Sequence, residues 1–275
     1  MITRMDPTIR LRTGAQMPRV GLGVYQSPSG EPTRRAVRDA LELGYRHIDT
    51  ARIYGNEADV GAAVRASGLP RAEIFVTTKL WNDDQGKKTT RRALDASLER
   101  LGLDYVDLYL IHWPVQGRRL DSWKILEELH AEGKARAIGV SNYMPHHLDE
   151  LLAVATTPPA VNQVELHPFL QQRETRAACA KHGIVVQAYS PLTRGHRLGD
   201  PTVARVAAEV KRTPAQVLLR WGLQHDLVVL PKSVHRPRIA ENGALFDFEL
   251  TPAHLKLLDG LDEGLATGWD PRRAP

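Results

Sequence analysis

Cysteine is nearly absent from this sequence, with Cys179 the only one among 275 residues. A single cysteine excludes a disulfide within the chain. The segment around it, RAACAKHG at 176–183, is typical of a helix in which a small thiol fills space in the core, and no basic pocket that would activate a thiolate is indicated. We therefore expect a buried structural cysteine.

Long hydrophobic runs are also missing. The longest apolar stretches, Val106–Ile111 and Leu227–Pro231, are far shorter than the ~20 residues that cross a bilayer. The N-terminal segment MITRMDPTIRLRTG alternates charges with single apolar residues and lacks the unbroken apolar core of a secretory signal. The sequence therefore predicts a cytoplasmic protein that has no membrane partner.

Charge of one sign does not accumulate either. The 37 Lys and Arg against 32 Asp and Glu give +5, but basic and acidic residues alternate, as they do on solvated helix faces. Nucleic-acid binding needs a basic stripe interleaved with aromatics, and aromatics make up only 6% of the chain. A nucleic-acid partner is therefore not expected.

Several motifs of enzymes and metal sites are absent. The sequence contains no phosphate-binding loop, no G-x-S-x-G and no H-E-x-x-H. His146-His147 resembles a metal-binding pair, but adjacent helical residues point about 100° apart and no further ligands complete a site, so we expect a helix N-terminus and no metal. GLGVYQ at 21–26 begins like a dinucleotide fingerprint, yet Gln26 replaces the third glycine and Pro28 follows, which argues against a doubly wound fold.

What the chain does contain is a regular alternation of short β-branched runs and longer segments of helical period, without a linker. Strands that alternate with helices pair in parallel, and eight such units close into a (β/α)8 TIM barrel. We expect one domain over residues 1–275, with an N-terminal hairpin of Thr8–Leu11 and Gln16–Pro18 as a plug. The predicted strands are Val20–Gly23, His47–Asp49, Ile74–Lys79, Val106–His112, Ala135–Ser141, Val161–Glu165, Val185–Ser190 and Val228–Pro231. The predicted helices are Thr33–Leu43, Glu57–Ser67, Thr89–Leu101, Asp121–Glu132, His146–Ala155, Glu174–His182, Pro214–Gln224 and Arg238–Phe246, followed by a last candidate at Pro252–Gly260.

Polar residues gather where consecutive predicted strands end, which is where barrel enzymes place their active sites. These residues are Asp49, Tyr54, Lys79 and His112. Each alone has an ordinary structural explanation: a turn cap, a packed ring, an extended amine or a satisfied core histidine. Because all four follow neighbouring strands, we expect their side chains to converge.

Their combined chemistry is that of carbonyl protonation. A tyrosine hydroxyl with a pKa near ~10 is a poor acid until a nearby cation stabilises its phenolate. Lys79 is the candidate cation, Asp49 its counter-charge, and His112 a group that holds a carbonyl oxygen beside Tyr54. The missing reactant is a hydride donor, which protein side chains do not supply.

At this point the chain resembles the aldo-keto reductase family of NADPH-dependent barrel enzymes. The resemblance covers nearly the whole chain through GLGVYQ at 21–26, GYRHIDTARIYGNE at 44–57, TTKLW at 77–81, DLYLIHWP at 107–114, IGVSNY at 138–143, VNQVELHP at 161–168, AYSPL at 188–192 and LPKSVHRPRIAEN at 230–242. It implies that Tyr54 is the proton donor, that Lys79 and Asp49 tune it, and that His112 orients the substrate.

The resemblance also implies an extended NADPH across the barrel mouth. Its implied contacts are Ser141, Asn142 and Gln163 at the carboxamide, Tyr189 stacked on the nicotinamide, Ser190, Pro191 and Leu192 along the pyrophosphate, Lys232, Ser233 and Arg238 at the 2′-phosphate, Glu241 and Asn242 beside the adenine, and also Val24, Tyr25, Asp49, Val234 and His235. Arg238 near a helix start suits a phosphate dianion, so NADPH should be preferred over NADH. His235-Arg236-Pro237 departs from the threonine and proline of many relatives and adds positive charge.

The substrate is less well specified. Tyr25, Tyr54, Trp81, His112 and Trp113 should contact it. The short segment Trp113–Leu120 and the 15 residues after Gly260 indicate the open site of the bacterial branch that includes 2,5-diketo-D-gluconate reductases. Small aldehydes, α-dicarbonyls and keto-sugars all fit, and the resemblance favours a monomer. Two other functions stay open: a non-catalytic NADPH-binding regulatory module, and an isomerase or aldolase with Lys79 as Schiff-base amine.

Overall fold

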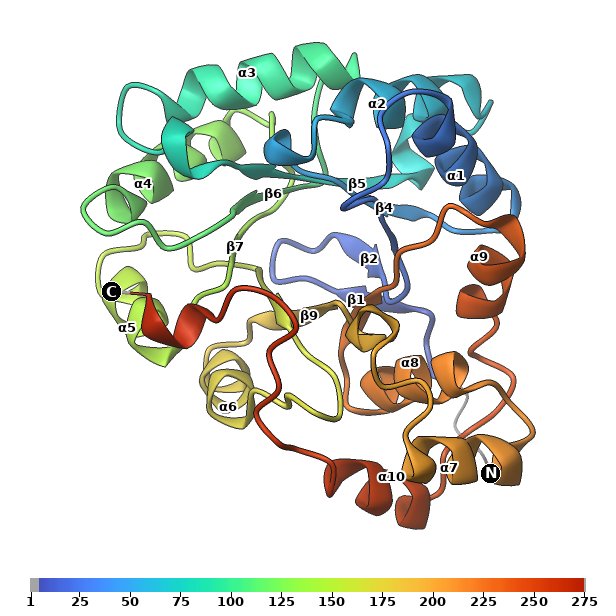
Figure 1. Cartoon of the computed structure of the whole chain (residues 1–275). Coiled ribbons are helices and arrows are strands. Elements are labelled where there is room, and N and C mark those ends of the chain that lie inside the picture. The colour runs from blue at the N-terminus through green and yellow to red at the C-terminus, as the bar shows by residue number, and fades with distance from the viewer. Residues whose placement is uncertain (1–4, 275) are drawn as a thin grey trace.

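Eight parallel strands form the centre of the computed structural model, which describes residues 5–274 (Figure 1). They pair in sequence order from β3 to β10. The ring closes between its first and last strands, because Val20 bridges Val229 and Gly23 bridges Lys232, both in parallel. The predicted (β/α)8 barrel is therefore confirmed. The strands are β3 (Leu22–Gly23), β4 (His47–Asp49), β5 (Phe75–Leu80), β6 (Leu108–Ile111), β7 (Ile138–Ser141), β8 (Val161–Glu165), β9 (Val185–Tyr189) and β10 (Val228–Leu230).

Helices surround the strands and bury their apolar faces against the ring (Figure 1). Helix α8 shows how the sequence sets a boundary: the Thr213 hydroxyl accepts from the Gln216 N–H, while the Gln216 side chain accepts from the Thr213 N–H. The helices are α1 (Glu31–Glu42), α2 (Glu57–Ala66), α3 (Thr90–Leu101), α4 (Arg119–Ala131), α5 (Pro145–Leu152), α6 (Arg173–Lys181), α7 (Pro201–Val210), α8 (Pro214–Gln224), α9 (Arg236–Gly243) and α10 (Pro252–Asp259).

Helix α7 was not predicted, and the expectation of one helix between β9 and β10 is wrong. The signals for it are nevertheless local. Asp200 accepts from the N–H groups of Thr202 and Val203 and so caps a helix that opens on a proline. Val203 and Val206 then face the core at helical spacing, and Lys211 ends the helix with a φ of 55°. The extra helix lengthens the chain between the seventh and eighth barrel strands.

The N-terminal hairpin closes the bottom of the barrel, as predicted. Strands β1 (Thr8–Arg10) and β2 (Gln16–Pro18) pair antiparallel. Leu11 and Met17 are buried, and they belong to an apolar cluster with residues of the barrel strands. Figure 1 shows the hairpin within the ring of strands. Since this end is filled by apolar side chains, a ligand must enter from the opposite end.

The structure also shows where the single cysteine and the His146-His147 pair lie. Cys179 is buried and free, and burial raises the pKa of its thiol to about 11, as expected of a structural cysteine. His147 lies in the first turn of α5, where its Nδ1 accepts from the Met144 N–H.

Within residues 5–274 no helix is long and apolar enough to span a bilayer, and no group of His, Cys, Asp or Glu is arranged to hold a metal. Residues 1–4 of the N-terminal segment, for which no secretory signal is expected, lie outside the described residues.

Candidate active site

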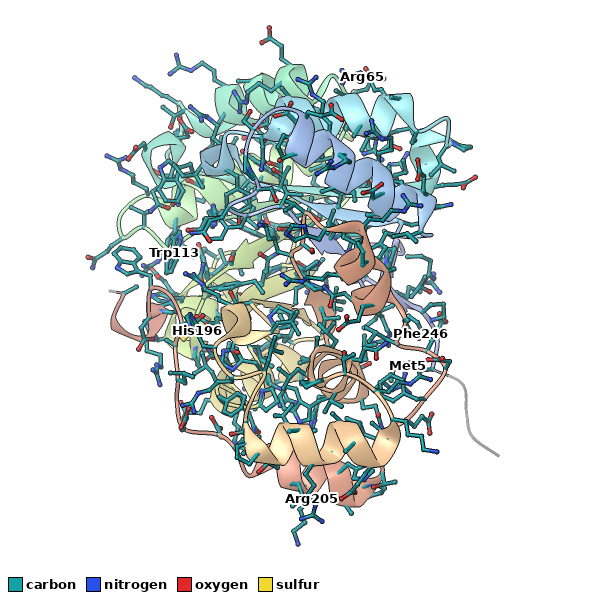
Figure 2. All side chains as sticks on the ribbon, turned by 45° about the vertical axis from the view of Figure 1, so that its right-hand side comes forward. Met5, Arg65, Trp113, His196, Arg205 and Phe246 are labelled. Atoms are coloured by element: carbon teal, nitrogen blue, oxygen red, sulfur yellow. The ribbon has the colours of Figure 1, made fainter. Side chains whose placement is uncertain are left out.

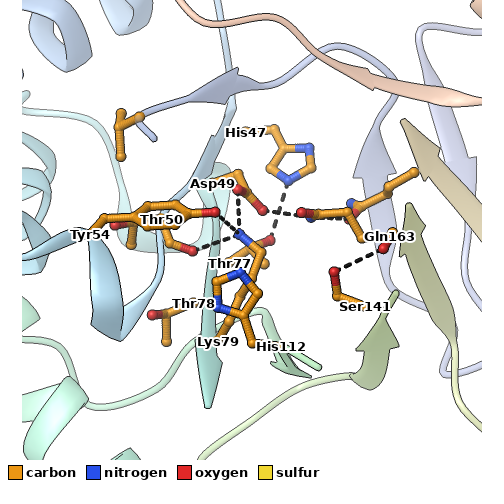
Figure 3. A network of polar contacts seen from close by, with 12 residues as sticks. His47, Asp49, Thr50, Tyr54, Thr77, Thr78, Lys79, His112, Ser141 and Gln163 are labelled. Carbon is orange, nitrogen blue, oxygen red and sulfur yellow. Dashed lines mark hydrogen bonds and ion pairs between the residues drawn. The ribbon is translucent and has the colours of Figure 1, made fainter. Parts of the chain in front are cut away.

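The four polar residues predicted at the strand ends meet in one place (Figure 3). Asp49 is the last residue of β4, Lys79 lies near the end of β5, and His112 follows β6 directly. The Lys79 Nζ donates to Asp49 Oδ1 at 2.6 Å and to the Thr50 carbonyl at 2.9 Å, and it lies 3.4 Å from the Tyr54 hydroxyl. The expected convergence is therefore present.

A short 3₁₀ turn, Arg52–Tyr54, brings the tyrosine back over the end of β4. Gly55 ends the turn at a φ of 69°, which is costly for a residue with a side chain. Buried Asn56 then fixes the loop, since its amide accepts from the Thr50 hydroxyl and donates to the Val24 carbonyl. The motif around Tyr54 thus serves to hold one phenol in place.

The Lys79–Asp49 pair is buried, and its charges balance each other. Burial lowers the pKa of Lys79, while the adjacent Asp49 carboxylate raises it and offsets part of that effect. Both side chains are almost completely enclosed. Removing either partner would leave an uncompensated charge in a low-dielectric site.

Tyr54 is a phenol in the free protein. Burial raises its pKa well above 10, and the Asp49 carboxylate adds to this rise. Burial is the largest cause of this rise, and the tuning of Tyr54 by Lys79 stays a prediction. The hydroxyl keeps its proton at neutral pH, as a proton donor must.

His112 is neutral for the same reason. Burial and the nearby Lys79 ammonium lower its pKa well below 6.5. Its ring lies edge-on to those of Tyr54 and Trp81, with centroids 5.8 and 5.4 Å away. Its buried Nδ1 has no hydrogen-bond partner among the described residues, so we assign the proton to Nε2, which makes Nε2 a donor.

A second polar network joins the ends of β7, β8 and β9. Gln163 Nε2 donates to Asp49 Oδ2 at 2.8 Å, and the Ser141 hydroxyl donates to the Gln163 carbonyl. Asn142 donates to the Ser141 hydroxyl and to the His112 carbonyl, and it accepts from the Tyr189 hydroxyl at 2.9 Å. These contacts fix two amides, Asn142 and Gln163, and two hydroxyls, Ser141 and Tyr189, beside the four-residue cluster.

A cavity of about 930 Å³ opens above both networks and extends along the loops after β9 and β10. It brings together almost every residue predicted to bind cofactor or substrate. Those lining it are Tyr25, Asp49, Tyr54, Trp81, His112, Trp113, Ser141, Asn142, Gln163, Tyr189, Ser190, Pro191, Leu192, Lys232, Ser233, Val234, His235, Arg238, Glu241 and Asn242.

Two predicted residues lie behind the wall of this cavity. Val24 belongs to the apolar core, and its backbone bonds to Asp49 and Asn56; its contact with a cofactor stays a prediction. Lys79 is enclosed between Asp49 and Tyr54 and does not face the cavity. A Schiff base at Lys79 would require the amine to leave Asp49, the Thr50 carbonyl and Tyr54.

The far end of the cavity carries two cations, Lys232 and Arg238, while the Glu241 carboxylate beside them accepts from the Thr213 hydroxyl. Across the described chain neither Lys232 nor Arg238 has an ion-pair partner, and burial lowers the pKa of Lys232. Arg236 differs, because its guanidinium binds Asp39 and Glu42 of α1 at 2.6 Å each. The positive charge expected from Arg236 is thus turned away from the cavity and neutralised.

Sequence reasoning missed several residues at the rim. Arg194 lies 5.9 Å from the centre of the Tyr25 ring, in a loop where Ser190, Thr193 and Arg194 all have positive φ. Trp269 stacks edge-on against Trp113 at 5.0 Å and is 75% exposed; Figure 2 shows Trp113 at the edge of the molecule. The positive φ angles around Arg194 and the contact of Trp269 with Trp113 produce no periodic pattern in the sequence, so neither residue could be predicted from it.

The chain after α10 reaches this rim through a specific anchor. Thr267 donates its N–H to the buried Glu165 carboxylate at 2.8 Å, and its hydroxyl bonds to the same oxygen. Glu165 is the last residue of β8, two positions beyond Gln163. The anchor thereby ties the tail to the strand that carries part of the site.

Comparisons with known proteins agree with this geometry. A model described as the Aldo/keto reductase family matches residues 19–263. A glyoxal reductase of Bacillus subtilis (strain 168) is 47% identical over 271 residues, which cover 98% of each chain. A morphine 6-dehydrogenase of Pseudomonas putida is 48% identical over 282 residues, covering 97% of this chain and 95% of that protein. The crystal structure of an aldo/keto reductase from Brucella melitensis is 45% identical with a TM-score of 0.90, covering 93% of this chain and 99% of that chain.

Proposed function

This chain belongs to the aldo/keto reductase family, and from that premise we propose that it reduces aldehydes and ketones to alcohols with NADPH. The observation that carries the proposal is the buried cluster of Tyr54, Lys79, Asp49 and His112 at the floor of a cavity. The cluster offers a protonated phenol and a neutral imidazole donor to one point, which is what a carbonyl oxygen requires.

The residues present fit the proposed cofactor. Lys232 and Arg238 are cations without acidic partners at one end of the cavity, and the Gln163 side-chain oxygen is an unused acceptor at the other. We propose that Lys232, Ser233 and Arg238 hold the 2′-phosphate, that the loop Ser190–Leu192 follows the pyrophosphate, and that Tyr189 packs on the nicotinamide. NADPH bound there would supply the hydride that the carbonyl carbon accepts.

The protein's own contribution is to hold and move one proton. His112 Nε2–H and the Tyr54 hydroxyl bind the carbonyl oxygen, and the charge that develops on this oxygen draws the phenol proton toward it. Lys79 then stabilises the resulting phenolate, since its Nζ is 3.4 Å away and remains ionised through Asp49. Before the reaction the charges of Lys79 and Asp49 balance each other. The Lys79 ammonium therefore acts on the reaction only when the proton leaves Tyr54 and a phenolate forms.

For the substrate we propose small aldehydes, α-dicarbonyls or keto-sugars. Support comes from the aromatic walls Tyr25, Trp81 and Trp113 and from similarity to a protein named glyoxal reductase. Placement in the 2,5-diketo-D-gluconate reductase branch, a cytoplasmic location and a monomeric state remain predictions from the sequence.

The experiment is oxidation of NADPH, followed by absorbance, with glyoxal, methylglyoxal, benzaldehyde and a keto-sugar. We expect turnover with at least one dicarbonyl. NADPH binding without turnover on any carbonyl would support the regulatory module instead. Borohydride trapping of substrate on Lys79 would support the Schiff-base reaction and contradict the proposal.

A further inference from the structure

A line of buried amides crosses the inside of the barrel beneath the active site. Gln163 on β8 and Gln187 on β9 are register partners on neighbouring strands, and both side chains are buried. Gln163 Nε2 donates to Gln187 Oε1 at 2.9 Å as well as to Asp49 Oδ2 at 2.8 Å. Gln187 Nε2 donates in turn to the Met17 sulfur at 3.1 Å. The line therefore runs from the active-site carboxylate to the hairpin that plugs the barrel.

The orientation of the Gln163 amide follows from these partners. A carboxylate only accepts hydrogen bonds, so the group facing Asp49 must be the amide nitrogen. The second hydrogen of that nitrogen is used by Gln187 Oε1. With both hydrogens occupied inside the barrel, Gln163 Oε1 is left toward the cavity, and no donor within the described residues reaches it.

Gln187 is not part of the cavity wall, yet it completes this arrangement. Without its oxygen, one buried N–H of Gln163 would have no acceptor, at a cost that favours rotation of the amide. Asp49 alone constrains one hydrogen and leaves the rest of the amide free to turn. Rotation of the Gln163 amide would also remove one of the two hydrogen bonds that the Asp49 carboxylate accepts, which come from Lys79 and Gln163.

We propose that Gln187 is a positioning residue that fixes the Gln163 amide so that its oxygen accepts the NH₂ group of the nicotinamide carboxamide. This inference rests on the proposed function, because it takes Gln163 to face that carboxamide. Gln187 acts only through Gln163, and its own Nε2 donates to the Met17 sulfur of the plug. The bottom of the barrel thereby contributes to recognition at the top.

The test compares two cofactors that differ at the one group concerned. NADP⁺ carries a carboxamide, whereas its 3-acetylpyridine analogue has a methyl in place of the NH₂ and cannot donate to Gln163. Dissociation constants are measured by tryptophan fluorescence, and the thermal midpoint of the cofactor-free protein is recorded. We expect Gln187→Met to raise the dissociation constant of NADP⁺ about three- to tenfold, the range of one neutral hydrogen bond, and that of the analogue less than about twofold.

Three further variants make the result specific. Gln187→Glu keeps an acceptor oxygen toward Gln163 and should restore the wild-type ratio of the two constants. Gln171→Met removes a buried amide that donates to the Pro168 and Asp259 carbonyls outside the cavity, so it should lower the thermal midpoint and leave the ratio unchanged. Gln187→Leu is a second variant without an acceptor, used where the Met variant does not fold.

The measurements distinguish a failure of the role of Gln187 from a failure of the proposed function. Equal changes for both cofactors in Gln187→Met and Gln187→Leu, or no change in either, would overturn the inference and leave the proposed function standing. A wild-type protein that binds neither cofactor would refute the proposed function itself. Gln163→Met is expected to shift the ratio at least as far as Gln187→Met; an unchanged ratio there would remove the carboxamide contact and with it the role of Gln187.

Discussion

The two ends of the cavity handle charge in opposite ways. At the inner end, Lys79 is matched by Asp49 at 2.6 Å, both are buried, and Tyr54 and His112 are neutral. At the outer end, Lys232 and Arg238 have no acid partner within the described chain. A site whose charges are paired within the protein keeps its geometry before a ligand binds. A site with unpaired positive charges attracts an anion that neutralises them. The difference supports the proposal that the chemistry takes place at the first end and that a phosphate binds at the second.

The largest expected effect comes from the inner end. Tyr54→Phe removes the proton donor and leaves the phosphate end untouched, so turnover should fall about 10²- to 10⁴-fold while NADPH affinity stays within about twofold. Turnover and fluorescence titration are measured on the same preparation. Tyr143→Phe, which removes another buried hydroxyl outside the cavity, is the matched control and should keep wild-type turnover. Substantial turnover in the Tyr54 variant would assign the proton to another group.

Lys79→Met should damage activity comparably and also destabilise the fold. It leaves the buried Asp49 carboxylate without its cation, at a cost of about 3–5 kcal/mol in the free energy of unfolding. Urea unfolding and the pH–rate profile are measured. Adding Asp49→Asn removes the second charge, so the double variant should regain most of the stability but none of the activity. A Lys79→Met protein with wild-type rate and pH profile would show that the lysine has only a packing role.

The inner end should also respond to acid. His47 precedes Asp49 by two residues on β4. Its Nδ1 donates to the Pro18 carbonyl, Nε2 of the neutral ring accepts from the Thr77 hydroxyl, and burial lowers its pKa to about 4. Its folded-state pKa is below the unfolded value of ~6.5, so the unfolded chain binds the proton first and stability falls as the pH drops from about 6.5 to 4. The shift corresponds to about 3 kcal/mol at the acid limit, and His112 acts in the same direction.

Urea titrations at pH 7.5, 6 and 5 measure this dependence. The His47→Gln variant should lose less of its unfolding free energy between these pH values than the wild type does. The exposed residue His196 gives the control His196→Gln, which should follow the wild type. Parallel curves for the wild type and the His47 variant would mean that His47 does not carry the acid sensitivity.

How much the sequence could predict differs along the molecule. The strands, the plug and the four converging residues were predictable because strand ends in a parallel barrel share one edge, which turns sequence positions into spatial neighbours. Helix α7 also has a local signal, because Asp200 caps it and Pro201 is its first residue. The tail contact of Thr267 with Glu165, the turn of Arg236 toward α1 and the raised pKa of Tyr54 depend on packing between distant segments. Such features do not follow from local pattern.

The smallest of these effects, and the one that tests the outer end, is expected from Arg238→Ala. Removal of a charge-assisted contact should cost about 1.5–3 kcal/mol of NADPH binding, which is roughly tenfold to more than a hundredfold in affinity. NADH lacks the 2′-phosphate, so its affinity should change much less. Arg236→Ala is the matched control, because Arg236 precedes Arg238 by two residues on α9 but binds Asp39 and Glu42, and its loss should leave the NADPH to NADH ratio unchanged. Equal losses for NADH and NADPH in the Arg238 variant would mean that this residue supports the fold or the adenine. Lys232 and Ser233 would then be left as the proposed phosphate ligands, and the unpaired charge of Arg238 would no longer distinguish phosphate recognition from simple attraction of anions.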